Sequence, residues 1–197
     1  KKLFFISLLF VLSIFVFPQD KNYKTTALSF SFNGLNLSSY YGGVGGRFWT
    51  SDSTVFNVSI GGSYSQKAYE ATENLEEGFE KNSSLTFGIG GEIHYPTSEN
   101  LSPYLSIRGS YSMNSRYYRP GYDDYESKDR INIISFDFGL GVEYWIADRI
   151  SLSGQHLFNL HLDVGERTVG GVENETQDIG GFGVGFGTTS IMLSVYF

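Results

Sequence analysis

Apolar side chains alternate with small or polar ones along most of the chain after residue 27. The stretch 131–147 shows the pattern most clearly, because from residue 134 its even positions are all apolar while its odd positions are mostly small or acidic. Strict alternation is typical of a β-strand with one apolar face. The same stretch, like the rest of the chain after residue 19, has no apolar stripe with the period of a helix. The sequence therefore predicts an all-β fold.

The same test finds eight such strands. Their apolar faces fall within residues 28–32, 44–48, 56–64, 85–95, 105–113, 131–147, 150–162 and 191–197. The breaks after the second, fourth and sixth strands are tight ("TSDST", "TSENLSP", "ADR"), whereas those after the third, fifth and seventh are long and polar, over residues 70–83, 118–130 and 165–178. Strands joined in this way predict an antiparallel up-and-down meander over residues 25–197, with both of its ends on the side of the tight turns.

The N-terminal residues 1–19 have a different character. Two lysines precede an apolar run that ends at Phe17. This order predicts a secretory signal peptide, and the run is shorter than the about 20 residues that a membrane-spanning helix needs. The small residues expected before a cleavage site are missing, so an uncleaved anchor is the alternative.

Alternation alone leaves open which face of a closed barrel points outward. A soluble barrel would hold a ligand against inward apolar side chains, and a membrane barrel would turn the same side chains into lipid. The chain has 24 Gly, 17 Phe and 14 Tyr. The narrow interior of an eight-stranded barrel accepts glycine and serine more easily than rows of aromatic rings. An exported protein that exposed eight apolar faces to water would aggregate. We therefore expect the apolar faces to contact lipid.

Repeated strand ends carry a family resemblance. The segments "GGVGGRFW", "GIGGEIHY" and "GLGVEYWI", together with the C-terminal "SIMLSVYF", resemble the small outer-membrane β-barrel proteins of the OmpA-like, OmpX-like and opacity-protein type. The resemblance implies an eight-stranded antiparallel transmembrane barrel in the outer membrane of a bacterium, monomeric and with both termini in the periplasm. It also implies an assembly signal for the outer-membrane assembly machinery in Ile191, Leu193, Val195 and Phe197.

Five charged residues fall on the polar faces of the predicted strands: Arg47, Glu92, Arg108, Asp137 and Glu143. Pairing positions that sum to about 200 around a turn near residue 100 sets Glu92 opposite Arg108. A buried charge is costly unless it is paired, so we expect these residues to form one interior layer near the tight turns. The layer is either a static plug or a gate that swaps partners, in which case the protein is a small porin or channel.

Three further side chains lie two residues after the repeated charges, at Trp49, His94 and Trp145. The period of two directs them inward as well, close to the tight turns. They are predicted to close the floor of the barrel.

Enzymatic chemistry finds little support in the sequence. There is no cysteine, and the inward His94 and His161 stand at different heights. The lipid A deacylases, which are eight-stranded barrels, use a histidine and a serine two residues later; the nearest text here is "SGQHLFN", where Phe158 follows His156. The sequence therefore predicts neither an enzyme, nor a metal site, nor a cofactor.

The net charge of −7 excludes nucleic acid as a partner. We assign the excess of acidic residues to the long connections, which would face the cell surface. There they either bind a basic partner or form a solvated acidic fringe that divalent cations bridge to lipopolysaccharide. Tyrosine offers contact area at low entropic cost, so the best candidate contacts are Tyr117, Tyr118, Tyr122 and Tyr125. The predicted role is structural support of the outer membrane or adhesin-like surface contact.

Overall fold

The computed structural model describes residues 26–32, 42–69, 78–95, 97–119, 126–170 and 175–197. The predicted signal peptide, residues 1–19, lies outside these ranges. The elements are β1 (Thr26–Phe32), β2 (Gly42–Trp49), β3 (Thr54–Tyr69), β4 (Gly78–His94), β5 (Leu101–Arg119), β6 (Glu126–Ala147), β7 (Ile150–Gly170) and β8 (Glu175–Tyr196). The described part of the chain contains no helix long and apolar enough to cross a membrane.

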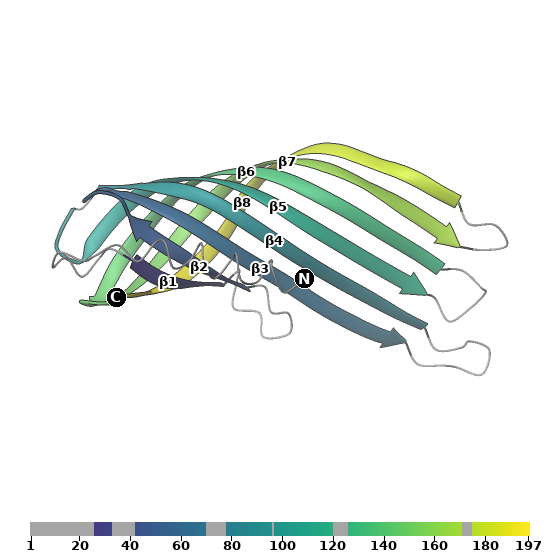
Figure 1. Ribbon diagram of the computed structural model, residues 1–197, viewed down its shortest axis with the longest axis horizontal. Coiled ribbons are helices and arrows are strands. Elements are labelled where there is room, and N and C mark those ends of the chain that lie inside the picture. Colours follow the sequence, from purple (N-terminus) through teal and green to yellow (C-terminus); the bar gives the residue numbers. More distant parts are fainter. Residues whose placement is uncertain (1–25, 33–41, 70–77, 96, 120–125, 171–174) are drawn as a thin grey trace, which may run out of the picture.

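The eight strands form a closed antiparallel barrel in chain order, which confirms the predicted fold class (Figure 1). Closure depends on β1, which pairs with β2 on one side and with β8 on the other. Ala27, for example, lies opposite Arg47 of β2 and opposite Tyr196 of β8. Every strand therefore has a hydrogen-bonded neighbour on both sides where the barrel is closed.

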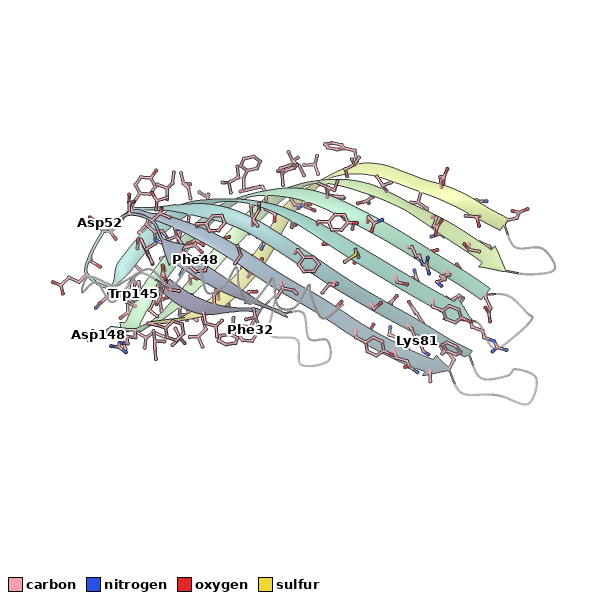
Figure 2. All side chains as sticks on the ribbon, viewed as in Figure 1. Phe32, Phe48, Asp52, Lys81, Trp145 and Asp148 are labelled. Atoms are coloured by element: carbon pink, nitrogen blue, oxygen red, sulfur yellow. The ribbon has the colours of Figure 1, made fainter. Side chains whose placement is uncertain are left out.

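The tight turns gather at one end of the barrel, as predicted, and we call this the short-turn end. Backbone bonds hold the turns, such as the one from the Thr50 N–H to the Thr54 carbonyl at 2.9 Å. The backbone N–H of Phe197 donates to the carbonyl of Thr26 at 2.9 Å, so β1 begins where β8 ends. Figure 2 labels Asp52 and Asp148 in turns of this end.

The strands differ strongly in length. β1 and β2 have 7 and 8 residues, whereas β3 to β8 have between 16 and 22. The six long strands continue past the closed part as a curved sheet toward the far end (Figure 1). The predicted ranges of the long loops were therefore too wide. Residues 78–83, 118–119, 126–130, 165–170 and 175–178 are strand, because polar side chains continue the alternation there.

The last strand was predicted only over residues 191–197, and it begins at Glu175. Its outward apolar side chains stand at even positions in the first half, such as Phe182, and at odd positions in the second, such as Ile191. A β-bulge opposite Leu157 and Phe158 causes the change of phase, because Leu157 pairs with residue 188 and Phe158 with residue 186. One extra residue thus interrupted the pattern that marked the strand.

The apolar side chains point away from the barrel and the polar ones into it (Figure 2). Ile107 is 54 % exposed and Phe136 56 %, whereas the inward Ser151 and Ser194 are fully buried. We call the outward apolar surface the apolar belt. On β4, β5 and β6 it comprises Leu85, Phe87, Ile89, Ile93, Leu101, Leu105, Ile107, Tyr111, Met113, Ile134, Phe136, Phe138, Leu140, Val142, Tyr144 and Ile146.

The C-terminal residues of the predicted assembly signal belong to the same outward face. Ile191 is 37 % exposed and Phe197 56 %, and Leu193 and Val195 are partly exposed between them. Their alternating inward neighbours are buried, from Ser190 to Tyr196. Recognition by the assembly machinery stays a prediction.

Glycines allow the strands and inward side chains of the closed part of the barrel to pack closely. A substitution at Gly90 tests this close packing. A Cβ at Gly90 would lie 2.6 Å from the backbone oxygen of Ile107 and 2.8 Å from Oδ1 of Asn57. We expect Gly90→Ala to lower the free energy of unfolding in lipid vesicles by about 1–3 kcal/mol, because β4 and β5 must move apart.

The matched control is Gly154→Ala on the outer face of β7, where the new Cβ would meet no atom within 4 Å. Urea titrations followed by tryptophan fluorescence measure both variants. Equal unfolding free energies for the two would contradict the close packing at Gly90.

Candidate functional site

Three charged side chains from alternate strands meet inside the short-turn end. Arg47 lies on β2, Glu92 on β4 and Glu143 on β6, and the period of two points each of them inward. Nη1 of Arg47 lies 2.7 Å from Oε1 of Glu143, and Nη2 lies 3.1 Å from Oε2. Nη2 also donates to Oε2 of Glu92. We call these three residues the turn-end cluster.

The turn-end cluster is enclosed, since its side chains are 1 %, 3 % and 0 % exposed. Two carboxylates share one guanidinium, so further donors must stabilise them. The hydroxyl of Tyr196 donates to Glu143 at 2.9 Å, and Ser151 donates to the same oxygen. Nδ2 of Asn57 donates to Glu92 at 3.0 Å. These bonds connect the cluster to β3, β7 and β8, so that it joins most of the wall.

Aromatic rings pack against the turn-end cluster on the side of the tight turns. His94 is buried, with Nε2 3.0 Å from Oε2 of Glu92, and its ring centre lies 4.7 Å from that of Trp49. Trp145 packs on Tyr196 at 4.6 Å, and Tyr104 stacks on His94 at 4.8 Å. The three residues predicted to form the floor therefore all lie inside the short-turn end, next to the charges.

A second ion pair lies farther along the barrel. Arg108 of β5 stands directly opposite Asp137 of β6, and Nη2 lies 2.6 Å from Oδ2. Nδ2 of Asn159 donates to the other carboxylate oxygen at 2.5 Å. Asp137 is buried, while the side chain of Arg108 is 36 % exposed.

The predicted pairing of Glu92 with Arg108 is wrong. Glu92 lies opposite Ser106, and Arg108 lies opposite Gly90, so paired positions sum to 198. The register is set by the turn, whose centre lies one residue earlier than the sequence suggested. As a result the five predicted charges form two layers, the turn-end cluster and the Arg108–Asp137 pair.

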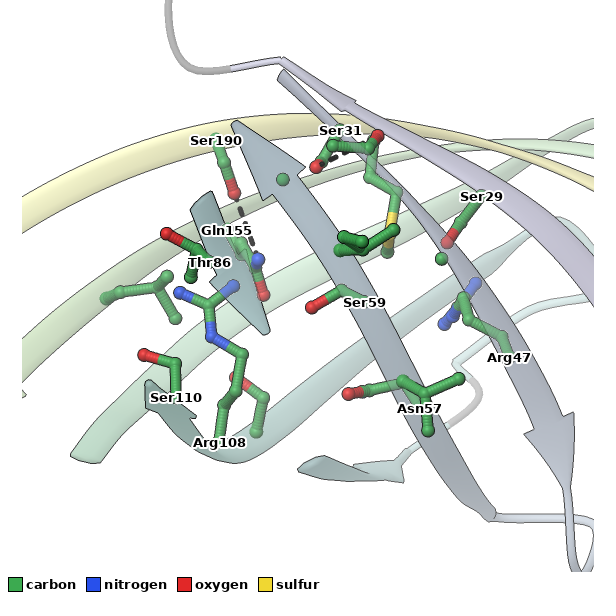
Figure 3. A pocket seen from close by; sticks show the side chains of 18 of the residues that line it. Ser29, Ser31, Arg47, Asn57, Ser59, Thr86, Arg108, Ser110, Gln155 and Ser190 are labelled. Carbon is green, nitrogen blue, oxygen red and sulfur yellow. Dashed lines mark hydrogen bonds between the residues drawn. The ribbon is translucent and has the colours of Figure 1, made fainter. Parts of the chain in front are cut away.

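A cavity of about 220 Å³ separates the two layers. Arg47 and Arg108 both border it, with serine, threonine, asparagine and glutamine side chains between them (Figure 3). The buried Nε of Arg47 and the hydroxyl of Ser106 have no hydrogen-bond partner within the described residues. The space is polar and large enough for several water molecules.

A third row of interior charges lies near the far end, and the sequence reasoning missed it. Glu80, Arg116, Asp129 and Arg167 come from β4, β5, β6 and β7. Nη2 of Arg116 lies 3.1 Å from Oε1 of Glu80. Arg167 donates to both oxygens of Asp129, at 2.8 and 3.0 Å. These hydrogen bonds hold the pKa of Asp129, which lies beyond the apolar belt, below its usual value.

Glu80, Asp129 and Arg167 fall within the long loops predicted from the sequence, and Arg116 lies beside one of them. The reason is that the segments around these residues are rich in charge. The available signal was the alternating sign of charge, since Glu80 precedes Lys81 and Asp129 stands between Lys128 and Arg130. The acidic excess is therefore not confined to loops, since Glu80, Asp129, Glu166, Glu175 and Asp178 lie on strands.

The tyrosines predicted as contact residues also do not all lie in a described loop. Tyr117 and Tyr118 belong to β5 rather than to a loop, whereas Tyr122 and Tyr125 lie outside the described residues. Tyr117 stacks on Phe79 of β4 with ring centres 5.3 Å apart.

The histidines do not converge. His156 is exposed on the outer face beside Phe158, and its Nδ1 lies 3.2 Å from Oγ1 of Thr189. His161 lies inside, with Nδ1 2.8 Å from Oδ1 of Asn159. Within the described residues, no three metal-binding side chains of the His, Cys, Asp or Glu type are grouped.

Solved structures with the same architecture place the barrel among known folds. A major outer membrane protein from Thermus thermophilus superposes with a TM-score of 0.58 at 11 % identity, over 87 % of this chain and 98 % of that one. The chain has the fold of the outer-membrane β-barrel proteins. At this identity the likeness concerns the fold alone.

Two further solved structures also match the chain. Neisserial surface protein A has a TM-score of 0.46 at 18 % identity, covering 87 % of this chain and 93 % of its own. The attachment invasion locus protein Ail of Yersinia pestis has a TM-score of 0.40 at 10 % identity, covering 87 % and 92 %. No protein-family model matches the sequence, and neither does any curated protein.

The turn-end cluster is more deeply buried than the Arg108–Asp137 pair. Replacing each arginine should therefore change the stability by different amounts. Arg47→Met leaves Glu92 and Glu143 buried without their shared partner. We expect it to lower the free energy of unfolding by about 3–5 kcal/mol, the usual effect of breaking a buried ion pair. Urea titration of the folded protein in lipid vesicles measures the change.

Arg108→Met is the matched control. Its side chain is partly exposed, and Asn159 still hydrogen-bonds Asp137 in its absence, so we expect a smaller loss. An equal or larger loss in this variant would contradict the central role of the turn-end cluster.

Proposed function

We propose that the protein is an integral outer-membrane barrel with a closed interior that supports the membrane or makes contacts at the cell surface. The observation that supports this most directly is the combination of the apolar belt outside with the fully enclosed turn-end cluster inside. An outward apolar surface around the whole barrel is stable in lipid and not in water. A buried cluster of ion pairs across the lumen opposes free diffusion of solutes.

The lengths of the turns support one orientation of the barrel in the membrane. In outer-membrane barrels the short turns face the periplasm and the longer connections face outward. The short-turn end, with the start of β1 and the end of β8, is accordingly assigned to the periplasm. The far ends of β3 to β8 then reach the cell surface, where they meet lipopolysaccharide and any surface ligand. The predicted partners remain outer-membrane lipid and the assembly machinery, with a monomer as the expected state.

The surface-contact role rests on the length of the strands beyond the belt. Residues 126–130 of β6 and 165–170 of β7 extend a charged two-faced sheet past the last apolar row. The acidic residues Glu73, Glu76 and Glu77, which we predicted to form part of the contact surface, lie outside the described residues. A basic ligand is the partner that these three acidic residues favour.

A gated channel is the second candidate function, because the polar cavity between the two ion-pair layers would form part of any water path through the barrel. Measurements of conductance across planar lipid bilayers distinguish the gated channel from the barrel with a closed interior. We expect no reproducible openings from the wild-type protein, because the turn-end cluster and the rings packed against it occupy the lumen at the short-turn end. Glu143→Gln, which keeps the side-chain volume, is expected to stay equally silent.

Reproducible wild-type openings that disappear in Arg108→Gln would overturn the closed interior in favour of the channel. Membrane insertion is tested separately. Heat-dependent migration on a detergent gel and fractionation with the outer membrane are expected, whereas recovery from the soluble periplasm would contradict the proposal as a whole.

A further inference from the structure

The outer face of β4, β5 and β6 changes from apolar to basic beyond the apolar belt. The last belt row on these strands ends with Leu85 and Met113. In the next rows toward the far end, the outward positions of the three strands carry four cations. These are Lys81, Arg119, Lys128 and Arg130, which we call the basic strip.

In two of these segments the acidic side chain points to the inside of the barrel and the basic side chains beside it point to the outside. In "EKN" of β4, Glu80 points inward to Arg116 while Lys81 points outward. In "KDR" of β6, Asp129 points inward to Arg167 while Lys128 and Arg130 are exposed outside. Although the chain has a net charge of −7, its surface at these outward positions is basic.

The strand register places the basic strip as a compact surface. Tyr117 lies directly opposite Lys81 on one side and directly opposite Lys128 on the other. The two lysines are therefore separated by one strand, or about 10 Å between their backbones. Nζ of Lys81 lies 4.8 Å from the ring centre of Phe79, which in turn stacks on Tyr117. Aromatic side chains of this kind are common where a barrel meets the lipid headgroups.

The carboxylates on the same face do not neutralise the basic strip. Glu126 lies on β6 near Tyr117. Glu166 of β7 lies opposite both Arg130 and Asp178, and its Oε1 is 3.9 Å from Nη1 of Arg130, whose side chain is 60 % exposed. At that distance and exposure the pair is weak. On β4 to β6 the four cations face one outward carboxylate.

The height of the basic strip matches the lipid headgroups. Successive outward residues rise about 7 Å along a strand, and the strands of such barrels are tilted by about 40°. Arg130 belongs to the first row beyond the belt and Lys81 and Lys128 to the second. These rows lie about 5 and 10 Å above the hydrocarbon, so the first lies within the headgroup layer, which is about 5–8 Å thick, and the second at its outer edge. Figure 2 labels Lys81 near the far end of its strand.

We propose that the basic strip binds lipid A through its phosphates, with the acyl chains lying along the apolar belt below. Lipid A carries a phosphate at each end of a disaccharide, which suits two groups of cations separated by a strand better than a single phosphate does. Arginine and lysine both form charge-assisted hydrogen bonds to phosphate oxygens. The inference rests on the proposed function, since it requires the far end of the barrel to face the outer leaflet.

The test compares lipid binding to the purified, folded protein in zwitterionic detergent. The probes are bis-phosphorylated lipid A, the same lipid with both phosphates removed, and phosphatidylglycerol. We expect lipid A to bind at least 10-fold more tightly than either of the other two. The variant K81Q/K128Q/R130Q is expected to lose that preference, while its binding of dephosphorylated lipid A stays unchanged.

The matched control is K67Q, because Lys67 stands at a similar height but on the inward side of β3, opposite Glu80. It should bind lipid A as the wild type does, and the single variant K128Q serves if the triple variant does not fold. Equal affinity for lipid A and phosphatidylglycerol, or an unchanged preference in the variants, would overturn the lipid A site while leaving the proposed function intact. A wild-type protein that does not insert into membranes at all would instead defeat the proposed function and the lipid A site together.

Discussion

The backbone of a strand in lipid must find all its hydrogen-bond partners within the protein, and this requirement governs the fold. Water is absent from the bilayer core, so an open sheet edge there leaves N–H and C=O groups unpaired at a cost of several kcal/mol each. The pairing of β1 with β8 removes both edges where the barrel closes. Closure with eight strands leaves a narrow interior, which is why most inward positions along the strands carry small or charged residues and the rows of apolar side chains lie outside.

The narrow interior imposes a second condition, because every charge in it must be paired. Arg47 meets this condition with a bidentate bond to Glu143 and a further bond to Glu92. Hydroxyl and amide groups from other strands supply the remaining donors. The turn-end cluster therefore also fixes the relative positions of strands that do not neighbour one another, which hydrogen bonding along the sheet cannot do.

Much of this architecture was predictable, because one rule of alternation determines both the strands and the side of the wall that each residue faces. The inward positions of Arg47, Glu92 and Glu143 followed from it directly. Their mutual contact did not, since β2, β4 and β6 are not adjacent and their meeting depends on the curvature of the closed wall. Neighbour pairing was wrong for Glu92 because an error of one residue in the centre of a turn shifts the sum of paired positions by two.

Other gaps had local causes. The bulge in β8 reverses the phase of its apolar residues, so that the first half of the strand was indistinguishable from a glycine-rich loop. At the far end, charged side chains on both faces concealed the alternation that an apolar face reveals elsewhere. Composition therefore suggested loops at Glu80 and Asp129, where the backbone remains extended.

The antiparallel order of the barrel also constrains how the chain can fold. Seven of the strand pairings join neighbours in sequence and can form as hairpins. The eighth joins Ala27 to Tyr196, which are 169 positions apart (196 − 27). Bringing together such distant segments carries the largest loss of chain entropy in the fold. The short β1, with seven residues, thus provides the hydrogen bonds that offset this loss, and its pairing with the end of β8 is the step that completes the barrel.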